Sequence, residues 1–333
     1  MKAVVLVGGF GTRLRPLTLT RPKQMLPVVN RPMIEHVIGH LVGHGVDEVV
    51  LSMGYRPDEF HAAYPDDHVA GVPMRYAVDP EPLDTAGAIR YSALEAGIDE
   101  RFVVVNGDVL TDIDIDALVA FHDDRGAEAT IALHRVDDPS AFGVVPTDAA
   151  GRVEAFVEKP PRDEAPTDLI NAGIYVMEPA VVDRIDAGRR VSVEREVFPA
   201  MVDDGVLYAR HDDAYWIDTG TPALYLRAQL DLLDGVRGER IDGVDPGAAV
   251  EPGADVSRAV VAAGASVADG AVVIESVVMA GAVVAAGARV ERSVIGFGAV
   301  VAEGAELDEV VLGDGEKTEH GERLHGLRRP EPD

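Results

Sequence analysis

A glycine-rich segment is the first part of this sequence whose residue types and spacing could do chemistry. It reads GGFGTRLR from Gly8 to Arg15 and directly follows the apolar run Ala3 to Val7. Glycines let backbone N–H groups approach a polyphosphate, and Arg13 or Arg15 can neutralise phosphate charge. The segment does not match the GxxxxGK[ST] phosphate loop, so a plain turn is the alternative. The pattern favours a phosphate-binding loop.

Lysine is scarce, which makes the position of each lysine informative. The chain has four, namely Lys2, Lys23, Lys159 and Lys317. Lys23 stands in PKQMLP between Pro22 and Pro27, and prolines stiffen the chain around it. A stiff segment holds a cation still, so Lys23 is a second candidate for phosphate binding, with a solvated surface lysine as the alternative.

The overall charge is strongly negative. With 30 Lys and Arg against 58 Asp and Glu, the formal net charge is −28. Nucleic acid phosphates and anionic membranes are therefore unfavourable partners, and any phosphate site must be built locally. Acidic residues spread over the whole chain are typical of halophilic-type proteins, and an ordinary acidic protein is the alternative.

The sequence has no cysteine, which excludes disulfides, thiolate nucleophiles and cysteine metal sites. The apolar run Ala3 to Val7 is too short for a secretory signal. No stretch approaches the ~18 apolar residues of a membrane span. We expect a soluble, cytoplasmic protein.

The elements that must position these residues show an alternation of strands and helices. Predicted strands are the β-branched runs Ala3 to Val7, Glu48 to Ser52, Met74 to Val78, Phe102 to Asn106 and Ala129 to His134. Predicted helices are Met33 to Gly43, Ala86 to Ala96 and Ile115 to Asp123. This alternation predicts an α/β fold with a doubly wound sheet, in which ligands bind after the strands that end at Val7 and Asn106.

After Gly235 the composition changes to Val, Ala and Gly, and a regular repeat begins. Val261, Val278 and Ile295 are evenly spaced and illustrate one of three registered aliphatic series, and in two of the series glycine follows each member at a fixed distance. Three short legs per coil predict a parallel β-helix of hexapeptide type with about four coils. We expect it over residues 241–315, with a flexible tail at 316–333.

The segment from Gly8 to Ile34, GGFGTRLRPLTLTRPKQMLPVVNRPMI, closely resembles the opening motif of the sugar-phosphate nucleotidyltransferases. Matching segments follow in the same order: Leu83 to Gly87, Asn106 to Asp108, Phe142 to Val144, Val157 to Pro160, Asn171 to Gly173 and Trp216 to Gly220. The hexapeptide domain occurs in several branches of this family, notably the mannose-1-phosphate guanylyltransferases. The resemblance covers nearly the whole chain except the tail. It implies a Rossmann-like nucleotidyltransferase domain over residues 1–235 and a left-handed β-helix.

The resemblance also implies roles for single residues. Catalytic roles fall to Arg13 on the leaving pyrophosphate, to Lys23 at the α-phosphate, and to Asp108 and Asp218, which match the two Mg²⁺ ligands of relatives. The residues expected to bind the nucleoside triphosphate are Gly8, Gly9, Gly11, Thr12, Arg13, Lys23, Thr85 and Gly87. Those expected to bind the sugar 1-phosphate are Gly143, Glu158, Lys159, Asn171 and Gly173. Asp84 stands where many relatives have glycine, which puts the base preference in doubt.

The implied reaction is nucleotidyl transfer from a nucleoside triphosphate to a sugar 1-phosphate, which releases pyrophosphate. The substrate phosphate is already an anion, so positioning and charge neutralisation suffice and no covalent nucleophile is needed. GTP with mannose 1-phosphate is favoured, and thymidylyl or uridylyl transfer to glucose 1-phosphate is the alternative. A non-catalytic regulatory subunit is an alternative of another class.

The β-helix is expected to serve assembly or regulation. Residues 241–315 contain no histidine, so the usual base for acyl transfer is missing. An open coil end favours a cover by another subunit or by the catalytic domain, and a homo-oligomer is the simplest such cover. His36, His40 and His44 have helical metal-ligand spacing, but a polar helix face is the preferred interpretation.

Overall fold

The structure is a computed structural model that describes residues 1–54, 57–79 and 81–331. It divides into two compact units, each formed from two stretches of chain. Unit 1 consists of Met1–Gly9 and Glu35–Trp216, and unit 2 consists of Phe10–Ile34 and Ile217–Asp333. The region predicted to be catalytic, residues 1–235, therefore contributes to both units, and part of it shares unit 2 with the β-helix.

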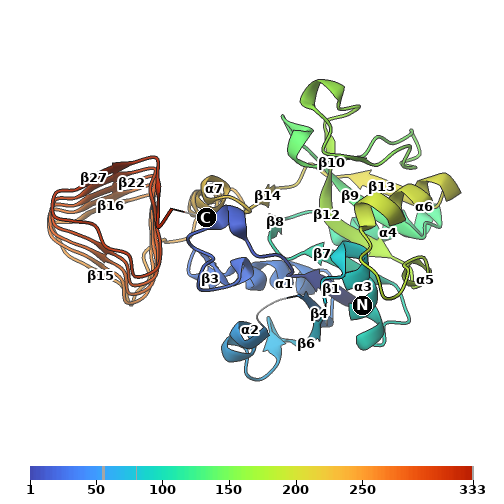
Figure 1. The fold of residues 1–333 in the computed structure, drawn as a ribbon, viewed down its shortest axis with the longest axis horizontal. Coiled ribbons are helices and arrows are strands. Elements are labelled where there is room, and N and C mark those ends of the chain that lie inside the picture. Colours follow the sequence, from blue (N-terminus) through green and yellow to red (C-terminus); the bar gives the residue numbers. More distant parts are fainter. Residues whose placement is uncertain (55–56, 80, 332–333) are drawn as a thin grey trace. The chain divides into compact units, whose positions relative to one another are not determined.

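Unit 1 is built on a mixed sheet, as Figure 1 shows. Its centre is parallel, because β1 pairs in parallel with β4 and β7, and β4 pairs in parallel with β6. β12 then runs antiparallel to β7. The strands are β1 (Lys2–Leu6), β4 (Glu48–Met53), β5 (His68–Val69), β6 (Val72–Val78), β7 (Phe102–Asn106), β9 (Ala129–Arg135), β10 (Gly143–Val144), β11 (Val157–Glu158), β12 (Leu169–Met177) and β13 (Leu207–His211).

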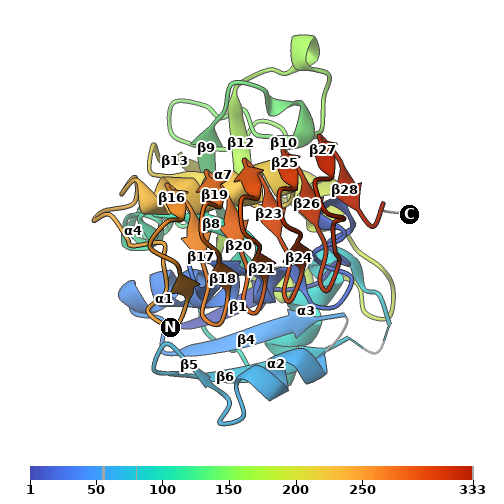
Figure 2. The same cartoon turned by 90° about the vertical axis from the view of Figure 1, so that its left-hand side faces the viewer.

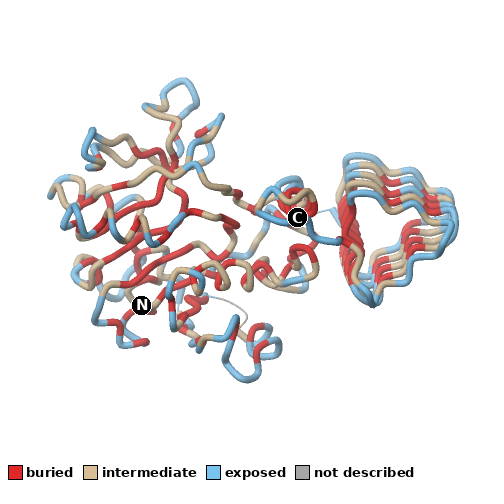
Figure 3. The backbone as a smooth tube through the Cα atoms, turned by 180° about the vertical axis from the view of Figure 1, so that it is seen from behind, coloured by how far each residue is buried: buried red, intermediate tan, exposed pale blue. Residues whose placement is uncertain are grey.

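The helices of unit 1 cover this sheet and bury its apolar residues. They are α1 (Met33–Gly43), which begins in unit 2, α2 (Pro57–Ala63), α3 (Asp84–Glu95), α4 (Ile115–Arg125), α5 (Ala180–Asp183) and α6 (Phe198–Asp204). Val4, Val50 and Val104 of three neighbouring strands are buried in one core with residues of α3 and α6. Figure 3 colours the buried stretches of the backbone red. Continuous β-branched runs buried on both faces are typical of parallel strands, so the predicted doubly wound sheet is confirmed.

Local sequence signals explain where these elements begin and end. Asp114 caps α4, because its carboxylate accepts from the backbone N–H of Ala117 at 2.9 Å. Gly126 ends the helix in the left-handed conformation at φ 56°. The strand Phe102–Asn106 and the helix Met33–Gly43 match their predicted bounds. The other predicted elements form with small shifts of their ends, which depend on caps and pairing partners.

Unit 2 begins with the segment that carries the glycine-rich loop. This segment forms two short 3-10 helices, η1 (Thr12–Leu14) and η2 (Lys23–Met25), and the hairpin of β2 (Pro27–Val28) and β3 (Arg31–Pro32). The chain returns to unit 2 after Trp216, at the start of β14 (Trp216–Asp218), and continues into α7 (Pro222–Leu233). Thr221 caps α7 by accepting from the backbone N–H of Leu224 at 3.3 Å.

The rest of unit 2 is a left-handed parallel β-helix, whose stacked legs are visible in Figure 2. Each leg pairs in register with the equivalent leg of the next coil, as Val267 does with Val284 and Val284 with Val301. These three side chains are fully buried within the coil stack. In the described part of the chain, the legs form three parallel sheets: β15 (Ala249–Val250), β18 (Ser266–Val267), β21 (Val283–Val284) and β24 (Val300–Val301); β16 (Asp255–Ser257), β19 (Val272–Ile274), β22 (Arg289–Glu291), β25 (Glu306–Asp308) and β27 (Arg323–His325); and β17 (Val260–Val261), β20 (Val277–Val278), β23 (Val294–Ile295), β26 (Val311–Leu312) and β28 (Arg328–Arg329).

Two kinds of corner turn the coil. Glycines such as Gly281 and Gly287 adopt φ values of 70° and 63°, the left-handed region that glycine tolerates. The third corner instead places charged residues at positive φ, as at Arg258 with 50° and Glu275 with 47°. Arg258 Nη1 pairs with Glu275 Oε1 at 2.5 Å, so an ion pair between successive coils accompanies this corner.

The prediction of a flexible tail at residues 316–333 is wrong for the described part of that segment. β27 pairs with β25 and β28 pairs with β26, so the β-helix continues beyond residue 315. The repeat was missed because two of its three aliphatic positions become polar there: Thr318 and Arg329 stand one repeat after Val301 and Leu312. Pro332 and Asp333 lie outside the described residues.

No helix in the described ranges combines the length and the apolar character that crossing a membrane would require.

Candidate active site

The glycine-rich loop leaves the carboxyl end of β1. Gly8 and Gly9 are exposed, and a Cβ added at either would meet no other atom within 4 Å. Gly9 adopts φ 97° and Gly11 adopts φ 60°, a region that side chains disfavour. Thr18 fixes the turn by donating from its hydroxyl to the carbonyl of Gly11 at 2.8 Å. The loop backbone is thus shaped and accessible, as a phosphate-binding loop requires.

Arg13 and Asp218, two predicted site residues of unit 2, lie side by side. Arg13 Nη2 is 3.7 Å from Asp218 Oδ2, and the Arg13 side chain is 64% exposed. The backbone N–H of Gly220 donates to Asp218 Oδ1 at 2.8 Å and orients the carboxylate. A Cβ added at Gly220 would stand 2.6 Å from Arg13 Nη2, so the absence of a side chain there makes room for the guanidinium.

Lys23 stands next to the same loop. It opens η2 directly after Pro22, and its Cβ lies 3.3 Å from the place a Cβ would take at Gly11. The following hairpin is tied to α7, because Gln229 Oε1 accepts from the backbone N–H of Val29 at 2.7 Å and Gln229 Nε2 donates to the carbonyl of Pro27 at 2.8 Å. Unit 2 therefore brings together Gly11, Thr12, Arg13, Lys23 and Asp218.

Asp108, the other predicted metal ligand, belongs to unit 1. It follows β7 after Asn106 and Gly107, and its side chain is half-buried. Gly107 allows β7 to approach β1 closely, because an added Cβ would lie 2.9 Å from Val7 Cγ1 and 3.0 Å from the carbonyl of Leu6. Asp108 thus stands at the carboxyl end of a central strand, where α/β sheets bind ligands.

Gly143, Glu158 and Lys159 are brought together by strand pairing in unit 1. Gly143 of β10 is the register partner of Glu158 of β11. A Cβ added at Gly143 would lie 2.7 Å from the Phe156 ring and 3.1 Å from Glu158 Oε2, so only glycine fits without displacing them. Lys159 Nζ pairs with Glu158 Oε1 at 2.6 Å, and the Lys159 side chain is 58% exposed. The Lys159 ammonium is therefore held by a carboxylate and remains accessible to an anion.

Asn171 and Gly173 lie at an irregularity in β12, where the register with β9 shifts between Asn171 and Tyr175. Asn171 Nδ2 donates to the Tyr175 hydroxyl at 2.8 Å, and Asn171 Oδ1 accepts from the backbone N–H of Gly173 at 2.9 Å. The Trp216 indole donates to the carbonyl of Ala172 at 2.9 Å and so braces the same bulge. Bulges of this kind commonly re-aim side chains beside sites.

Thr85 and Gly87, predicted to contact the nucleotide, form internal contacts in unit 1. The Thr85 hydroxyl donates to Glu194 Oε2 at 2.8 Å and accepts from the backbone N–H of Val193 at 2.9 Å. Gly87 donates its backbone N–H to the carbonyl of Val191 at 3.2 Å. Asp84 adopts φ 62°, a conformation that glycine favours. The structure assigns these residues to the start of α3, and their contact with a nucleotide stays a prediction.

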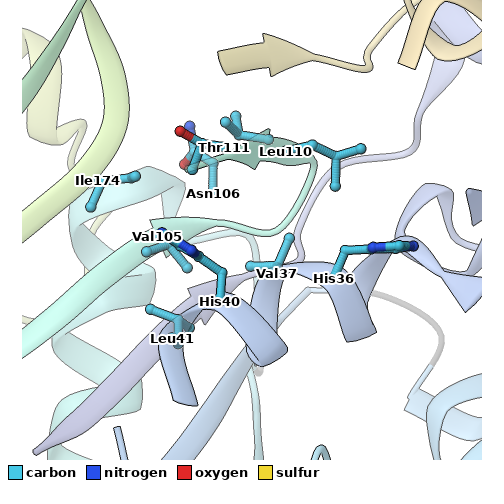
Figure 4. A pocket seen from close by; sticks show the side chains of 10 residues that line it. His36, Val37, His40, Leu41, Val105, Asn106, Leu110, Thr111 and Ile174 are labelled. Carbon is cyan, nitrogen blue, oxygen red and sulfur yellow. The ribbon is translucent and has the colours of Figure 1, made fainter. Parts of the chain in front are cut away.

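The helix-borne histidines have partners within unit 1. His40 Nε2 is 3.0 Å from the carbonyl of Ile113, and His44 Nδ1 is 3.0 Å from Asp116 Oδ2. Ligand atoms of His44, Asp114 and Asp116 lie within 4.8 Å of one another, but Asp114 is already used as the α4 cap. His36, His40 and Asn106 are among the residues that line a cavity of about 10 Å³, and Figure 4 shows their side chains. A cavity of that size holds about one water and no substrate.

Asp79 was not among the predicted site residues. It follows β6, and its backbone N–H donates to the carbonyl of Met53, the last residue of β4. Asp79 Oδ1 is buried without a hydrogen-bond partner among the described residues, and burial raises the pKa of this carboxyl to about 6. Its only signal in the sequence is its place after a strand, which many other acidic residues share.

Two protein families match successive parts of the chain. The nucleotidyl transferase family matches residues 2–235, and the GlmU-like C-terminal hexapeptide family matches residues 232–322.

Named relatives agree with these matches. The chain is 46% identical to a mannose-1-phosphate guanylyltransferase of Mycobacterium tuberculosis over 76% of this chain and 72% of that protein. It is 43% identical to a probable mannose-1-phosphate guanylyltransferase of Arabidopsis thaliana, over 71% of this chain and 66% of that protein.

Solved structures share the fold of most of the chain. A Bacillus anthracis protein provisionally described as a glucose-1-phosphate thymidylyltransferase matches with a TM-score of 0.63 and 26% identity, over 69% of this chain and 94% of that protein. HddC from Yersinia pseudotuberculosis, complexed with GMP-PN, matches with a TM-score of 0.59 and 28% identity, over 68% of this chain and 97% of that protein.

Proposed function

Because the chain belongs to the nucleotidyl transferase family, we propose that it transfers the guanylyl group of GTP to mannose 1-phosphate, giving GDP-mannose and pyrophosphate. The observation that carries this proposal is the 46% identity to a mannose-1-phosphate guanylyltransferase over 76% of the chain. The complex of HddC with GMP-PN supports a guanine nucleotide. Arg13 beside Asp218 supplies a cation at a glycine-rich loop, which suits a triphosphate.

The reaction is an in-line displacement at the α-phosphorus. An oxygen of the sugar phosphate forms the new P–O bond, and the bond between the α-phosphorus and the bridging oxygen of pyrophosphate breaks. The nucleophile is already an anion, so no proton must be removed from it. Arg13 and Lys23 offset charge on the triphosphate, and Lys159 holds the sugar phosphate. Without these cations, two polyanions would repel each other in a chain of formal charge −28.

We further propose that Asp108 and Asp218 hold Mg²⁺. Carboxylate oxygens are the ligands this ion prefers, and the backbone N–H of Gly220 orients Asp218 at 2.8 Å. When bound, the ion would neutralise phosphate charge. Gly8, Gly9, Gly11, Thr12, Thr85 and Gly87 remain the proposed nucleotide contacts, and Gly143, Glu158, Lys159, Asn171 and Gly173 the proposed sugar-phosphate contacts.

A homo-oligomer and a cytoplasmic location complete the proposal. Ala249 and Val250 of β15, in the first coil, are both exposed, and β15 pairs only with β18 among the described strands. A second copy that covers this coil would pair the open edge and bury its valine. Light scattering during size-exclusion chromatography tests it, because a monomeric mass would remove the oligomer from the proposal.

The substrate test is a panel of four nucleoside triphosphates against mannose 1-phosphate and glucose 1-phosphate, read as pyrophosphate release with Mg²⁺. We expect the highest kcat/KM for GTP with mannose 1-phosphate. A preference for dTTP or UTP with glucose 1-phosphate would replace the guanylyl assignment by the thymidylyl or uridylyl one. No turnover with any pair, from a folded protein, would favour a non-catalytic subunit.

A further inference from the structure

The β-helix departs from its own repeat at one corner. Equivalent positions of successive coils carry Ala263 and Ala280 early in the stack but Phe297 and Asp314 later. A corner needs only a small residue, as the earlier coils show, so an aromatic ring and a carboxylate are not required by the coil itself. The departure therefore calls for an explanation outside the repeat.

Asp314 and Phe297 contact the loop segment of unit 2. Asp314 Oδ2 accepts from the Thr20 hydroxyl at 2.5 Å and from Arg21 Nη2 at 3.2 Å. Asp314 Oδ1 accepts from the backbone N–H of Phe297 at 3.0 Å, which fixes the carboxylate. The Arg21 guanidinium lies over the Phe297 ring, 3.6 Å from its centroid. Exposure of only 27% for Arg21 and 13% for Asp314 makes this ion pair poorly screened.

A second departure from the repeat, at Arg328, contacts the loop segment closer to its glycine-rich end. Val311 of β26 is the register partner of Arg328 of β28, where preceding coils also carry valine. Arg328 Nη1 donates to the carbonyl of Arg13 at 2.8 Å and to that of Arg15 at 3.2 Å. A Cβ added at Gly313 would lie 3.0 Å from Pro16 Cβ, so a bare glycine there lets the loop approach.

We propose that Asp314 and Arg328 of the β-helix are positioning residues for the nucleotide loop, which places the repeat domain within the catalytic machinery. The inference rests on the proposed function, because Arg13 is the loop's proposed triphosphate cation. Arg328 fixes the backbone of Arg13, and Asp314 fixes the other end of the segment through Thr20 and Arg21. A misplacement of about 1 Å in such a group lowers turnover about 10²-fold.

The test compares Arg328→Ala and Asp314→Ala with Arg323→Ala in the full-length protein. Arg323 is a matched control, because its Nη2 pairs with Glu306 Oε1 at 3.0 Å on an exposed face of the same β-helix. We call Arg328→Ala and Asp314→Ala the loop variants, because both remove a contact to the loop segment. We expect kcat/KM for the nucleotide to fall about 10- to 100-fold in both. KM for the sugar 1-phosphate should stay near wild type in both, the Tm should stay near wild type in Arg328→Ala, and every constant of the control should be unchanged. Arg328→Lys should recover part of the loss, because an ammonium can still donate to the two carbonyls.

Hydrogen exchange of the amides in residues 11–21, measured without substrate, gives a readout independent of turnover. Both loop variants should exchange faster there than wild type and Arg323→Ala. If wild type lacks turnover but exchange accelerates, the positioning role stands and the proposed function fails. If wild type turns over while neither the nucleotide constants nor exchange change in the loop variants, the positioning role is overturned. An equal rise of both KM values with a lower Tm would also overturn it, because that pattern indicates general destabilisation.

Discussion

Replacing Asp218 by asparagine separates the structural role of this carboxylate from its proposed catalytic role. The Asp218→Asn variant would keep the size of the side chain. It would also keep an oxygen that can accept from the backbone N–H of Gly220, which in the wild-type chain is 2.8 Å from Asp218 Oδ1. The ion pair with Arg13 would be lost, but it spans 3.7 Å and the Arg13 side chain is 64% exposed. Pairs of this kind contribute less than about 1 kcal/mol, so we expect Tm to fall by less than about 4 °C.

The effect of Asp218→Asn on turnover should be far larger. Loss of a charged ligand from a phosphoryl-transfer site removes charge stabilisation that matters in the transition state, and we expect kcat/KM to fall about 100- to 1000-fold. The assay is pyrophosphate release with GTP and mannose 1-phosphate over a Mg²⁺ titration, beside a thermal melt. Asp213→Asn is the matched control, because it makes the same change of side chain nearby in the sequence at a carboxylate that is 84% exposed. Asp218→Asn activity within threefold of wild type, or an equal loss in the control, would refute the reasoning.

Four further substitutions test other residues of the chain. Lys23→Ala should lower kcat and Lys159→Ala should raise KM for the sugar 1-phosphate, since we propose that the first acts at the α-phosphate and the second in sugar-phosphate binding; identical kinetics would contradict this. The pKa of Asp79 is raised from 3.8 to about 6, so the folded state binds more protons than the unfolded state between these values, and its stability declines as pH rises through them. Asp79→Asn should flatten that decline in Tm from pH 4 to 6, and an unchanged slope would oppose the assignment. Gly143→Ala should raise KM for the sugar 1-phosphate, because its Cβ would stand 2.7 Å from the Phe156 ring; wild-type kinetics would show that the ring moves freely.

The fold could be predicted where the pattern of side chains is dictated by burial. β7 is a continuous run of buried apolar residues, and the coils of the β-helix bury apolar residues at fixed intervals, so both patterns can be recognised in the sequence. The sequence pattern did not predict the last coil, because Thr318 takes the place of a buried aliphatic residue and acts as a hydrogen-bond acceptor. Its Oγ1 accepts from the backbone N–H of Ala302 at 2.8 Å, which replaces apolar packing by a polar contact. Such a substitution keeps the coil and removes its sequence signal.

The sequence could predict which residues belong to the candidate site better than it could predict the hydrogen bonds that those residues form. Motif resemblance and scarce lysines selected Lys23 and Lys159, and the chain places both beside motif residues of their own unit. The partner of the Thr85 hydroxyl, Glu194, is 109 residues away in the sequence. No local pattern encodes a hydrogen bond at that separation, so a contact assigned from a motif alone cannot reveal that the hydroxyl is already engaged.

Burial also distinguishes arginines that the sequence leaves equivalent. Arg13 and Arg21 flank the same loop, and each faces an aspartate within unit 2. Arg21 is 27% exposed, stacks on Phe297 and pairs with Asp314, which is itself 13% exposed. Its charge is therefore engaged in holding the loop segment against the β-helix. Arg13 is 64% exposed and 3.7 Å from its aspartate, a weak contact that a phosphate can displace. The same residue type therefore holds the segment in place at Arg21, whereas at Arg13 it stays exposed in the position that we propose for ligand binding.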